Sequence, residues 1–418
     1  MPVKDAEVFL KALFNAAVAA SHPGHKLAAF LPADNTGKAV VIGAGKGAAA
    51  MANAFEAHWQ GPIRGMVVTR YGHSEDCKYI EVVEAAHPVL DAASTLAAEK
   101  TLALVDSVQA DETLFCLLSG GGSSLLSLPA TGISLNQKQA INKALLKCGA
   151  AIDEVNCVRK HLSAIKGGKL ALRCGNKAIY TYAISDVPYD DPTVIASGPT
   201  VADPSTRTQA LAITQKYGVA LPDNVLQWLL DDACETPKIL PAENHYQLIA
   251  TPIDALNAAA TLAKQYGIEP LILGDTIEGE ASEVAKVFAA IARFVASHNL
   301  PTPKPCVILS GGETTVTVKG TGRGGRNAEF LLSLFNELKG HANIYALACD
   351  TDGIDGTEDN AGAFFTPSDW TNAMTLNLNS GDYLANNDGY SFFKALDKLI
   401  ITGPTRTNVN DFRALLVL

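Results

Sequence analysis

Short runs of Val, Ile and Leu alternate along this chain with longer stretches in which apolar residues recur every three to four positions. The first pattern is typical of strands buried in a parallel sheet, and the second is typical of helices that cover such a sheet. Their alternation predicts β-α-β units. A first set comprises strands at 38–42, 64–69, 80–84, 113–118 and 178–184, and helices at 5–20, 46–59, 91–108, 135–150 and 205–217.

The segment 219–245 breaks this pattern with Pro222, Pro237 and Pro241, and we interpret it as a linker. A second set of elements follows: strands at 246–250, 270–273, 306–310, 313–319 and 343–349, and helices at 253–266, 279–297 and 326–338. The sequence therefore predicts two α/β domains. The first, at residues 1–235, is expected to be Rossmann-like with three layers. The second, at residues 245–418, is expected to have a mixed sheet.

Composition narrows the class of protein. A chain of 418 residues is longer than one hydrophobic core serves, which agrees with two domains. With 33 basic and 43 acidic residues its net charge is −10, so a nucleic-acid partner is not expected. No apolar stretch is long enough for a membrane span, and the first residues include acids where a signal peptide is apolar, so we expect a cytoplasmic protein without a membrane partner. The eight cysteines form no C-x-x-C pair, which argues against structural zinc.

Glycine-rich loops follow several predicted strands, and ligands of open α/β sheets bind at such strand ends. In the first loop Lys46 lies among glycines between a strand and a helix, which suits an anion. The second loop has three consecutive glycines between serines and predicts a phosphate cradle. A hydrolase with Ser123 as nucleophile is disfavoured because Leu125 stands where the G-x-S-x-G pattern needs glycine. The phosphate-binding residues expected here are Gly45, Gly120, Gly121, Gly122, Ser123 and Ser124.

Two more glycine-rich loops lie in the second half of the chain. Residues 308–315 repeat the Ser-Gly-Gly of the second loop, and residues 320–327 combine four glycines with two arginines. The planar guanidinium of Arg326 suits bidentate binding of a carboxylate or phosphate. The phosphate-binding residues expected in this half are Gly311, Gly312, Gly324 and Gly325.

Charged segments complete the candidate chemistry. Acidic loops at 185–192 and 350–356 follow predicted strands, and carboxylates beside phosphate-binding loops are what magnesium-dependent phosphoryl transfer needs. The segment 156–170 is basic in an acidic protein, and helical spacing places Arg159 and Lys166 on one face. This segment is either a solvated helix face or an anchor for an acidic substrate.

Six segments together resemble the type-2 glycerate kinase family, which has a C-terminal MOFRL domain. They are residues 43–52, 117–126, 156–171, 185–200, 309–330 and 350–364, in the same order and nearly from end to end of the chain. The resemblance implies ATP-dependent phosphorylation of D-glycerate at the 2-hydroxyl to 2-phospho-D-glycerate, in a cleft between two α/β domains, with the MOFRL region at about 305–415. The chain departs from the family pattern at Ala328, where glutamine is usual, and at Asp350, where a small or neutral residue is usual.

Under this interpretation ATP and Mg²⁺ are the expected cofactors, and a homodimer is expected. The site residues are assigned as follows: Lys46, Arg326 and Asp190 to catalysis, Arg159 and Lys160 to the substrate, and Asp186, Asp191 and Glu313 to the metal. The alternative is an NAD(P)H-dependent hydroxypyruvate reductase. It would make Gly43, Gly45 and Ala48 a dinucleotide fingerprint, with Arg70 on the 2′-phosphate of NADPH. A non-catalytic ligand-binding protein is the third interpretation.

Overall fold

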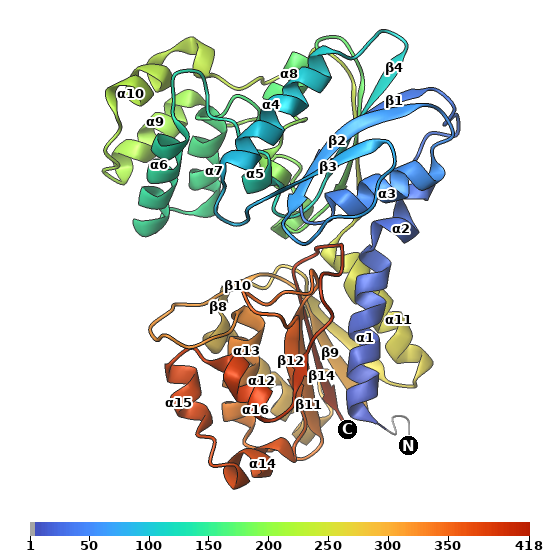
Figure 1. Cartoon of the computed structure of the whole chain (residues 1–418). Helices are drawn as coiled ribbons and strands as arrows, with labels where there is room; N and C mark the ends of the chain where they lie inside the picture. Colours follow the sequence, from blue (N-terminus) through green and yellow to red (C-terminus); the bar gives the residue numbers. More distant parts are fainter. Residues whose placement is uncertain (1–4) are drawn as a thin grey trace. The chain divides into compact units, whose positions relative to one another are not determined.

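The computed structural model describes residues 5–418, which form two compact units (Figure 1). The central unit is Lys26–Ile249, and the terminal unit combines the residues up to His25 with Ala250–Leu418. Each unit has its own buried hydrophobic clusters, as expected for a chain too long for one core. No helix within residues 5–418 is long and apolar enough to cross a membrane.

The sheet of the central unit has the strand order β3-β2-β1-β4-β5-β6. The strands are β1 (Lys38–Ala44), β2 (Ile63–Arg70), β3 (Ile80–Ala85), β4 (Glu112–Leu118), β5 (Ile179–Ile184) and β6 (Asn244–Ala250). The pairs among β1 to β5 are parallel, which confirms the predicted Rossmann-like sheet. Because the strand order reverses between β1 and β4, ligands are expected beyond the carboxyl ends of these two strands.

Helices surround this sheet, and four of them form a separate group. The helices of this unit are α3 (Ala48–His58), α4 (Ala92–Asp106), α5 (Gly122–Leu125), α6 (Leu135–Lys147), α7 (Ile152–His161), α8 (Lys169–Arg173), α9 (Arg207–Lys216) and α10 (Asp223–Leu230), and the short α2 (Pro23–Lys26) spans the boundary between the two units in the sequence. Helices α6, α7, α9 and α10 gather at one side of the unit, around a cluster that includes Leu145, Val158 and Leu229 (Figure 1). Capping boxes at Ser134 and Thr206 set the first residues of α6 and α9.

The terminal unit has a mixed sheet with the order β13-β12-β11-β14-β9-β7, as predicted for the second domain. The strands are β7 (Glu269–Gly274), β9 (Cys306–Ser310), β11 (Ile344–Asp350), β12 (Gly362–Phe365), β13 (Leu399–Ile400) and β14 (Asp411–Val417); β8 (Gly279–Glu280) and β10 (Thr314–Thr315) pair separately. Strand β14 is antiparallel to both β9 and β11, so the last strand of the chain lies in the middle of the sheet.

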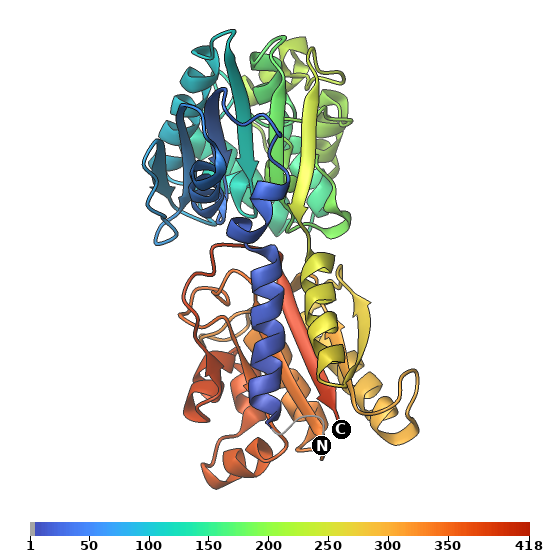
Figure 2. The same cartoon turned by 90° about the vertical axis from the view of Figure 1, so that its right-hand side faces the viewer.

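Helices cover both faces of this mixed sheet. They are α1 (Ala6–Ser21), α11 (Pro252–Gln265), α12 (Ala281–His298), α13 (Arg326–Leu338), α14 (Asp369–Thr375), α15 (Ser380–Ala385) and α16 (Gly389–Ala395). Helices α1 and α11 lie side by side on one face (Figure 2), while α12 and α13 pack together against the other. Helix α13 is amphipathic and buries Phe330, Leu331 and Phe335 in the core of the unit.

The boundaries of the units differ from the expected domains 1–235 and 245–418. The helix expected at 5–20 is α1, which packs on α11 and belongs to the terminal unit. The strand expected at 246–250 to open the second domain is β6, which completes the first sheet beside β5. The interpretation of 219–245 as a linker is wrong, because it contains α10 and belongs to the central unit. Residues 1–4 of the expected first domain lie outside the described part.

Candidate active site

Hydrogen bonds join the loops that follow the neighbouring strands β1 and β4. Lys46 donates its backbone N–H to the carbonyl oxygen of Gly120 at 2.8 Å. Gly47 donates its N–H to the hydroxyl oxygen of Ser119 at 2.9 Å. Gly45 has a φ of 139°, and a Cβ there would lie 2.1 Å from the same hydroxyl oxygen, so this position requires glycine. The structure therefore brings Lys46 next to the triple-glycine loop.

Several backbone N–H groups expected to bind phosphate are already engaged. Four of the expected residues donate their N–H to carbonyl oxygens of the chain itself: Gly45, Gly122, Ser124 and Gly311. The bonds of Gly122 and Ser124 close the turn of the triple-glycine loop, and those of Gly45 and Gly311 join their loops to neighbouring strands, so these four N–H groups are not free for a phosphate. Among the described residues no acceptor takes the N–H of Gly120, Gly121 or Ser123, and these three remain suitable for a phosphate.

The end of the acidic segment contacts the triple-glycine loop. The hydroxyl oxygens of Ser123 and Ser197 are 2.7 Å apart. Ala196 and Ser197 have backbone φ values of 50° and 62°, which residues other than glycine rarely adopt. A Cβ at Gly122 would lie 2.8 Å from the Cβ of Ala196, so the contact depends on glycine. Backbone strain of this kind is concentrated at functional sites, and here it brings two predicted motifs together.

Three aspartates of the acidic loop after β5 lie near one another: Asp186, Asp190 and Asp191. The charges of all three act on the buried hydroxyl of Tyr246, which has no hydrogen-bond partner within residues 5–418. Burial raises the pKa of Tyr246, and the charges of these aspartates raise it further. Within residues 5–418, no three His, Cys, Asp or Glu side chains are arranged to hold a metal ion. Mg²⁺ is usually held by one or two carboxylates together with substrate phosphates, and the oxygen ligands of this loop fit that requirement.

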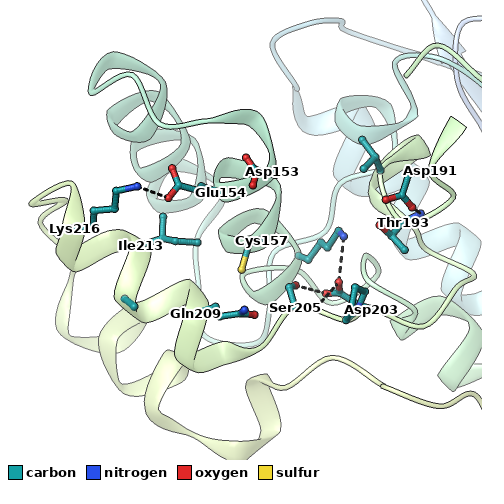
Figure 3. A pocket seen from close by; sticks show the side chains of 14 residues that line it. Asp153, Glu154, Cys157, Asp191, Thr193, Asp203, Ser205, Gln209, Ile213 and Lys216 are labelled. Carbon is teal, nitrogen blue, oxygen red and sulfur yellow. Dashed lines mark hydrogen bonds and ion pairs between the residues drawn. The ribbon is translucent and has the colours of Figure 1, made fainter. Parts of the chain in front are cut away.

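A pocket of about 680 Å³ lies between α7 and α9 in the central unit, and Asp191 contributes to its wall (Figure 3). Lys160, expected to bind the substrate, also lines it. The Lys160 ammonium forms an ion pair with Asp203 at 3.2 Å, and both side chains are buried. Lys216, at the opposite end, pairs with Glu154 at 2.7 Å. Because carboxylates neutralise both lysines, the pocket suits an uncharged group better than a phosphate.

Arg159, the other expected substrate residue, lies on α7 and is partly buried. Its guanidinium contacts the side-chain oxygen of Asn156 at 3.5 Å and forms no ion pair with any residue in the described part of the chain. Burial lowers the pKa of Arg159. The interpretation of 156–170 as a solvated helix face is wrong, because Lys160 and Lys166 are both buried.

Arg326, the first residue of α13, binds three carboxylates through three different nitrogens. Its Nε donates to Asp411 at 2.7 Å, and its terminal nitrogens donate to Glu313 at 2.7 Å and Asp350 at 2.9 Å. Burial alone would lower the pKa of Arg326, but the three carboxylates outweigh it and hold the pKa well above its usual value. Glu313, an expected metal ligand, is therefore part of an ion pair. The fully buried Arg413 also binds Asp411.

The start of α13 is fixed by a buried carboxylate. Asp355 accepts the backbone N–H groups of Asn327 at 3.0 Å and Ala328 at 2.8 Å, as a helix N-terminus favours. A Cβ at Gly325 would lie 2.3 Å from a carboxylate oxygen of Asp355, so the loop needs glycine for this approach. Burial raises the pKa of Asp355 to about 6. The presence of glycine at position 325 is thus explained by this close approach, independently of its expected role in phosphate binding.

Comparisons with known proteins agree with this architecture. Two family models match: the domain of unknown function DUF4147 over residues 9–230 and the MOFRL family over residues 306–411. A D-glycerate 2-kinase of Thermotoga maritima is 40% identical, over 94% of each chain. The chain belongs to the glycerate kinase family. A putative hydroxypyruvate reductase of Agrobacterium vitis is 49% identical, over 98% of this chain and 94% of its own, so both names occur within the family.

A solved structure from the same family has the same fold. The crystal structure of glycerate kinase from Thermotoga maritima matches this structure with a TM-score of 0.90 and 38% identity, covering 99% of each chain. The resemblance drawn from the six segments is thus confirmed. No pattern in the sequence singles out Lys138, Asp411 or Asn327: Lys138 is buried, and Asp411 binds both Arg326 and Asn327. Asp411 directly precedes the apolar residues at the end of the chain, and an aspartate at the edge of such a stretch was the available signal.

Proposed function

We propose that this protein transfers the γ-phosphoryl group of ATP to the 2-hydroxyl of D-glycerate, using Mg²⁺ and giving 2-phospho-D-glycerate and ADP. Relatives named glycerate 2-kinase, with identities of 37% and 40% over at least 90% of this chain, support the substrate and the reaction. The observation that carries the choice between kinase and reductase is the hydrogen bonding of the first glycine loop.

A dinucleotide fingerprint needs free backbone N–H groups in the turn between strand and helix, because these hold the pyrophosphate. Here the N–H groups of Gly45, Lys46 and Gly47 donate to Val68, Gly120 and Ser119, respectively. The backbone N–H groups of the first loop are therefore already bonded, to the second loop and to β2. The first loop leaves no row of free backbone N–H groups for a pyrophosphate. This arrangement favours a kinase, in which the second loop binds phosphate, over a reductase.

The proposed chemistry needs groups that position the reactants and neutralise charge. The N–H groups of Gly120, Gly121 and Ser123 bind the nucleotide phosphates. Lys46 stabilises charge on the transferring phosphoryl group or the glycerate carboxylate. Arg326 does the same when Glu313, the most exposed of its three carboxylate partners, gives up its ion pair to the ligand. Asp190 accepts the proton of the 2-hydroxyl while that oxygen bonds to the γ-phosphorus, and the bond from this phosphorus to the β–γ bridging oxygen breaks.

The three aspartates of the loop after β5 fit a magnesium ion, and of these Asp186 and Asp191 would hold it. The ion would neutralise negative charge on the nucleotide phosphates. Glu313 is a weaker candidate ligand, because it already neutralises Arg326. The location of the reaction between the two units, a homodimer and a cytoplasmic location stay predictions.

Two assays of the purified protein test this proposal. With D-glycerate and Mg-ATP we expect formation of ADP, and phosphorus NMR should identify the product as the 2-phosphate rather than the 3-phosphate. With hydroxypyruvate and NADPH or NADH we expect no loss of the reduced nicotinamide. Nicotinamide oxidation without ADP formation would refute the proposal.

Arg70 provides a matched control for the two interpretations. It ends β2 and would bind the 2′-phosphate of NADPH in a reductase, but it has no task in the kinase. Arg70→Ala should therefore leave the rate of ADP formation unchanged. A selective loss of NADPH use in this variant would favour the reductase.

A further inference from the structure

Two of the buried basic side chains in the central unit have no acidic partner. Lys138 on α6 is 5% exposed and Lys166 is 2% exposed. Buried charges are normally paired, as Lys160 is with Asp203 in the same unit. Within residues 5–418, no carboxylate forms an ion pair with Lys138 or Lys166, and the same is true of the partly buried Arg159.

The bonds that these three cations do form are all to uncharged oxygens. The Lys138 ammonium donates to the hydroxyl oxygen of Ser127 at 3.0 Å, and the Lys166 ammonium donates to the carbonyl oxygen of Leu126 at 3.2 Å. Because Leu126 and Ser127 are consecutive, the two ammonium groups are anchored side by side. A lysine has three donors and an arginine five, so most donors of this group are left over.

The three charges are also close enough to repel one another. Burial lowers the pKa of Lys138 to about 7, and the charges of Arg159 and Lys169 add to this effect. Burial likewise places the pKa of Lys166 well below its usual value, with further repulsion from Lys138 and Arg159. No carboxylate contributes to either shift. Like charges buried close together repel one another, and a bound anion would replace this repulsion with attraction.

The cations also adjoin the triple-glycine loop. Leu126 and Ser127 directly follow α5, which begins at Gly122 within that loop. On the other side, the residue after Lys166, Gly167, donates its N–H to the carbonyl oxygen of Ser197 at 3.0 Å, and Ser197 contacts the loop through Ser123. Two independent connections thus link the segments that carry the cations to the triple-glycine loop.

We propose that Lys138, Arg159 and Lys166 form an oxyanion-binding site of the central unit, which holds a carboxylate or phosphoryl group of the reactants. The inference rests on the proposed function for the identity of those reactants, but the site itself rests on burial, on the missing carboxylates and on the shared anchor at 126–127. In this site Lys138 and Lys166 take the role expected of Lys160, because Asp203 neutralises Lys160 and no described carboxylate pairs with the other two. Lys138 and Lys166 are positioned to bind the anion together with the fork of Arg159.

Binding of inorganic and organic anions, measured without turnover, tests this site. D-Glycerate and tripolyphosphate are added separately, each against sodium chloride at equal ionic strength, and the dissociation constant is measured by calorimetry. We expect one of the two to bind the wild-type protein, and which one binds identifies the source as carboxylate or phosphoryl. Lys138→Met and Lys166→Met should each weaken it about 10- to 100-fold, the scale of one charge-assisted hydrogen bond.

Matched variants separate loss of the site from loss of the fold. Lys143→Met removes an exposed lysine from the same helix and should bind the anion as the wild type does. Arg159→Gln, at a partly exposed position, provides a third site variant that should fold. At pH 7 binding to the wild-type protein should take up protons, seen as a dependence of the heat on the buffer, and Lys138→Met should reduce this uptake.

Two results would overturn the site: neither anion binds the wild-type protein, or the Lys138, Lys166 and Arg159 variants bind as tightly as the wild type. These outcomes are independent of the kinase assay. Anion binding that depends on the three cations, in a protein that forms no ADP from glycerate and Mg-ATP, would refute the proposed function and leave the site standing.

Discussion

Lys138→Met is expected to stabilise this protein while removing an activity. A lysine whose pKa falls from 10.5 to about 7 on folding makes the protonated folded state about 5 kcal/mol less stable. Methionine keeps the length and most of the volume of the side chain. The substitution leaves the buried Ser127 hydroxyl without its partner, which costs about 1–3 kcal/mol. The net expectation is a gain of about 2–4 kcal/mol at pH 6.

The pH dependence of this gain follows from the sign of the shift. Between pH 7 and 10.5 the unfolded chain still binds the proton of Lys138 while the folded chain has released it, so the stability of the wild type rises with pH in this window. The cost of the lysine is complete below pH 7 and absent above 10.5. Lys138→Met should therefore lose its advantage on going from pH 6 to pH 10, where only the unpaired hydroxyl remains.

Urea denaturation of wild type and variant at these two pH values measures the effect, with Lys143→Met as the control for loss of a positive charge on α6. The control should lie within about 0.5 kcal/mol of the wild type. A variant that is less stable than the wild type at pH 6 would refute the reasoning, since it would mean that the folded protein compensates the charge of Lys138. Turnover of glycerate should fall in the stabilised variant, because binding groups are often kept at the expense of stability.

Three further predictions concern other charged groups. Lys46→Ala should keep its circular dichroism spectrum and lose roughly 10²–10³-fold in kcat, the scale for removing one charge-stabilising donor, and near-normal turnover would remove Lys46 from the site. Arg326→Lys should lose most activity and about 3 kcal/mol of stability because one ammonium cannot serve three carboxylates, and a fully active variant with an unchanged urea midpoint would contradict this. The side-chain hydrogen bond from Arg64 lowers the pKa of Glu112 to about 2, so its contribution to stability is present above about 4.5 and is lost as the pH falls toward 2. Acid titration of Glu112→Gln should lack this loss, and an acid transition identical to that of the wild type would refute the assignment.

The elements around the first sheet could be predicted because their signal is local. The strand expected at 38–42 lies within β1, and the strand expected at 64–69 lies within β2. Strands covered on both faces carry uninterrupted apolar runs, which neighbouring residues alone reveal. The sheet that a strand joins is not a local property. The apolar run at 246–250 suits either sheet, and pairing beside β5 decided the outcome.

The helix α1 illustrates the same limit at the level of domains. Its apolar face, with Phe9, Leu13 and Phe14, predicts an amphipathic helix but does not say which core it covers. In the structure this face packs with α11, far along the chain, so the first helix belongs to the last unit. Its position in the sequence suggests that α1 belongs to the first domain, but the packing of its apolar face on α11 places it in the terminal unit.

By itself the sequence determined the type of chemistry, since glycine-rich and acidic loops follow apolar strands, where ligands of α/β sheets bind. It could not determine which charges are free. Tertiary structure neutralises Lys160 with Asp203 and, within residues 5–418, leaves Lys138 and Lys166 buried without a carboxylate partner. The physical reason is that electrostatic energy depends on distance and burial, and both are decided by segments that meet only in the folded chain.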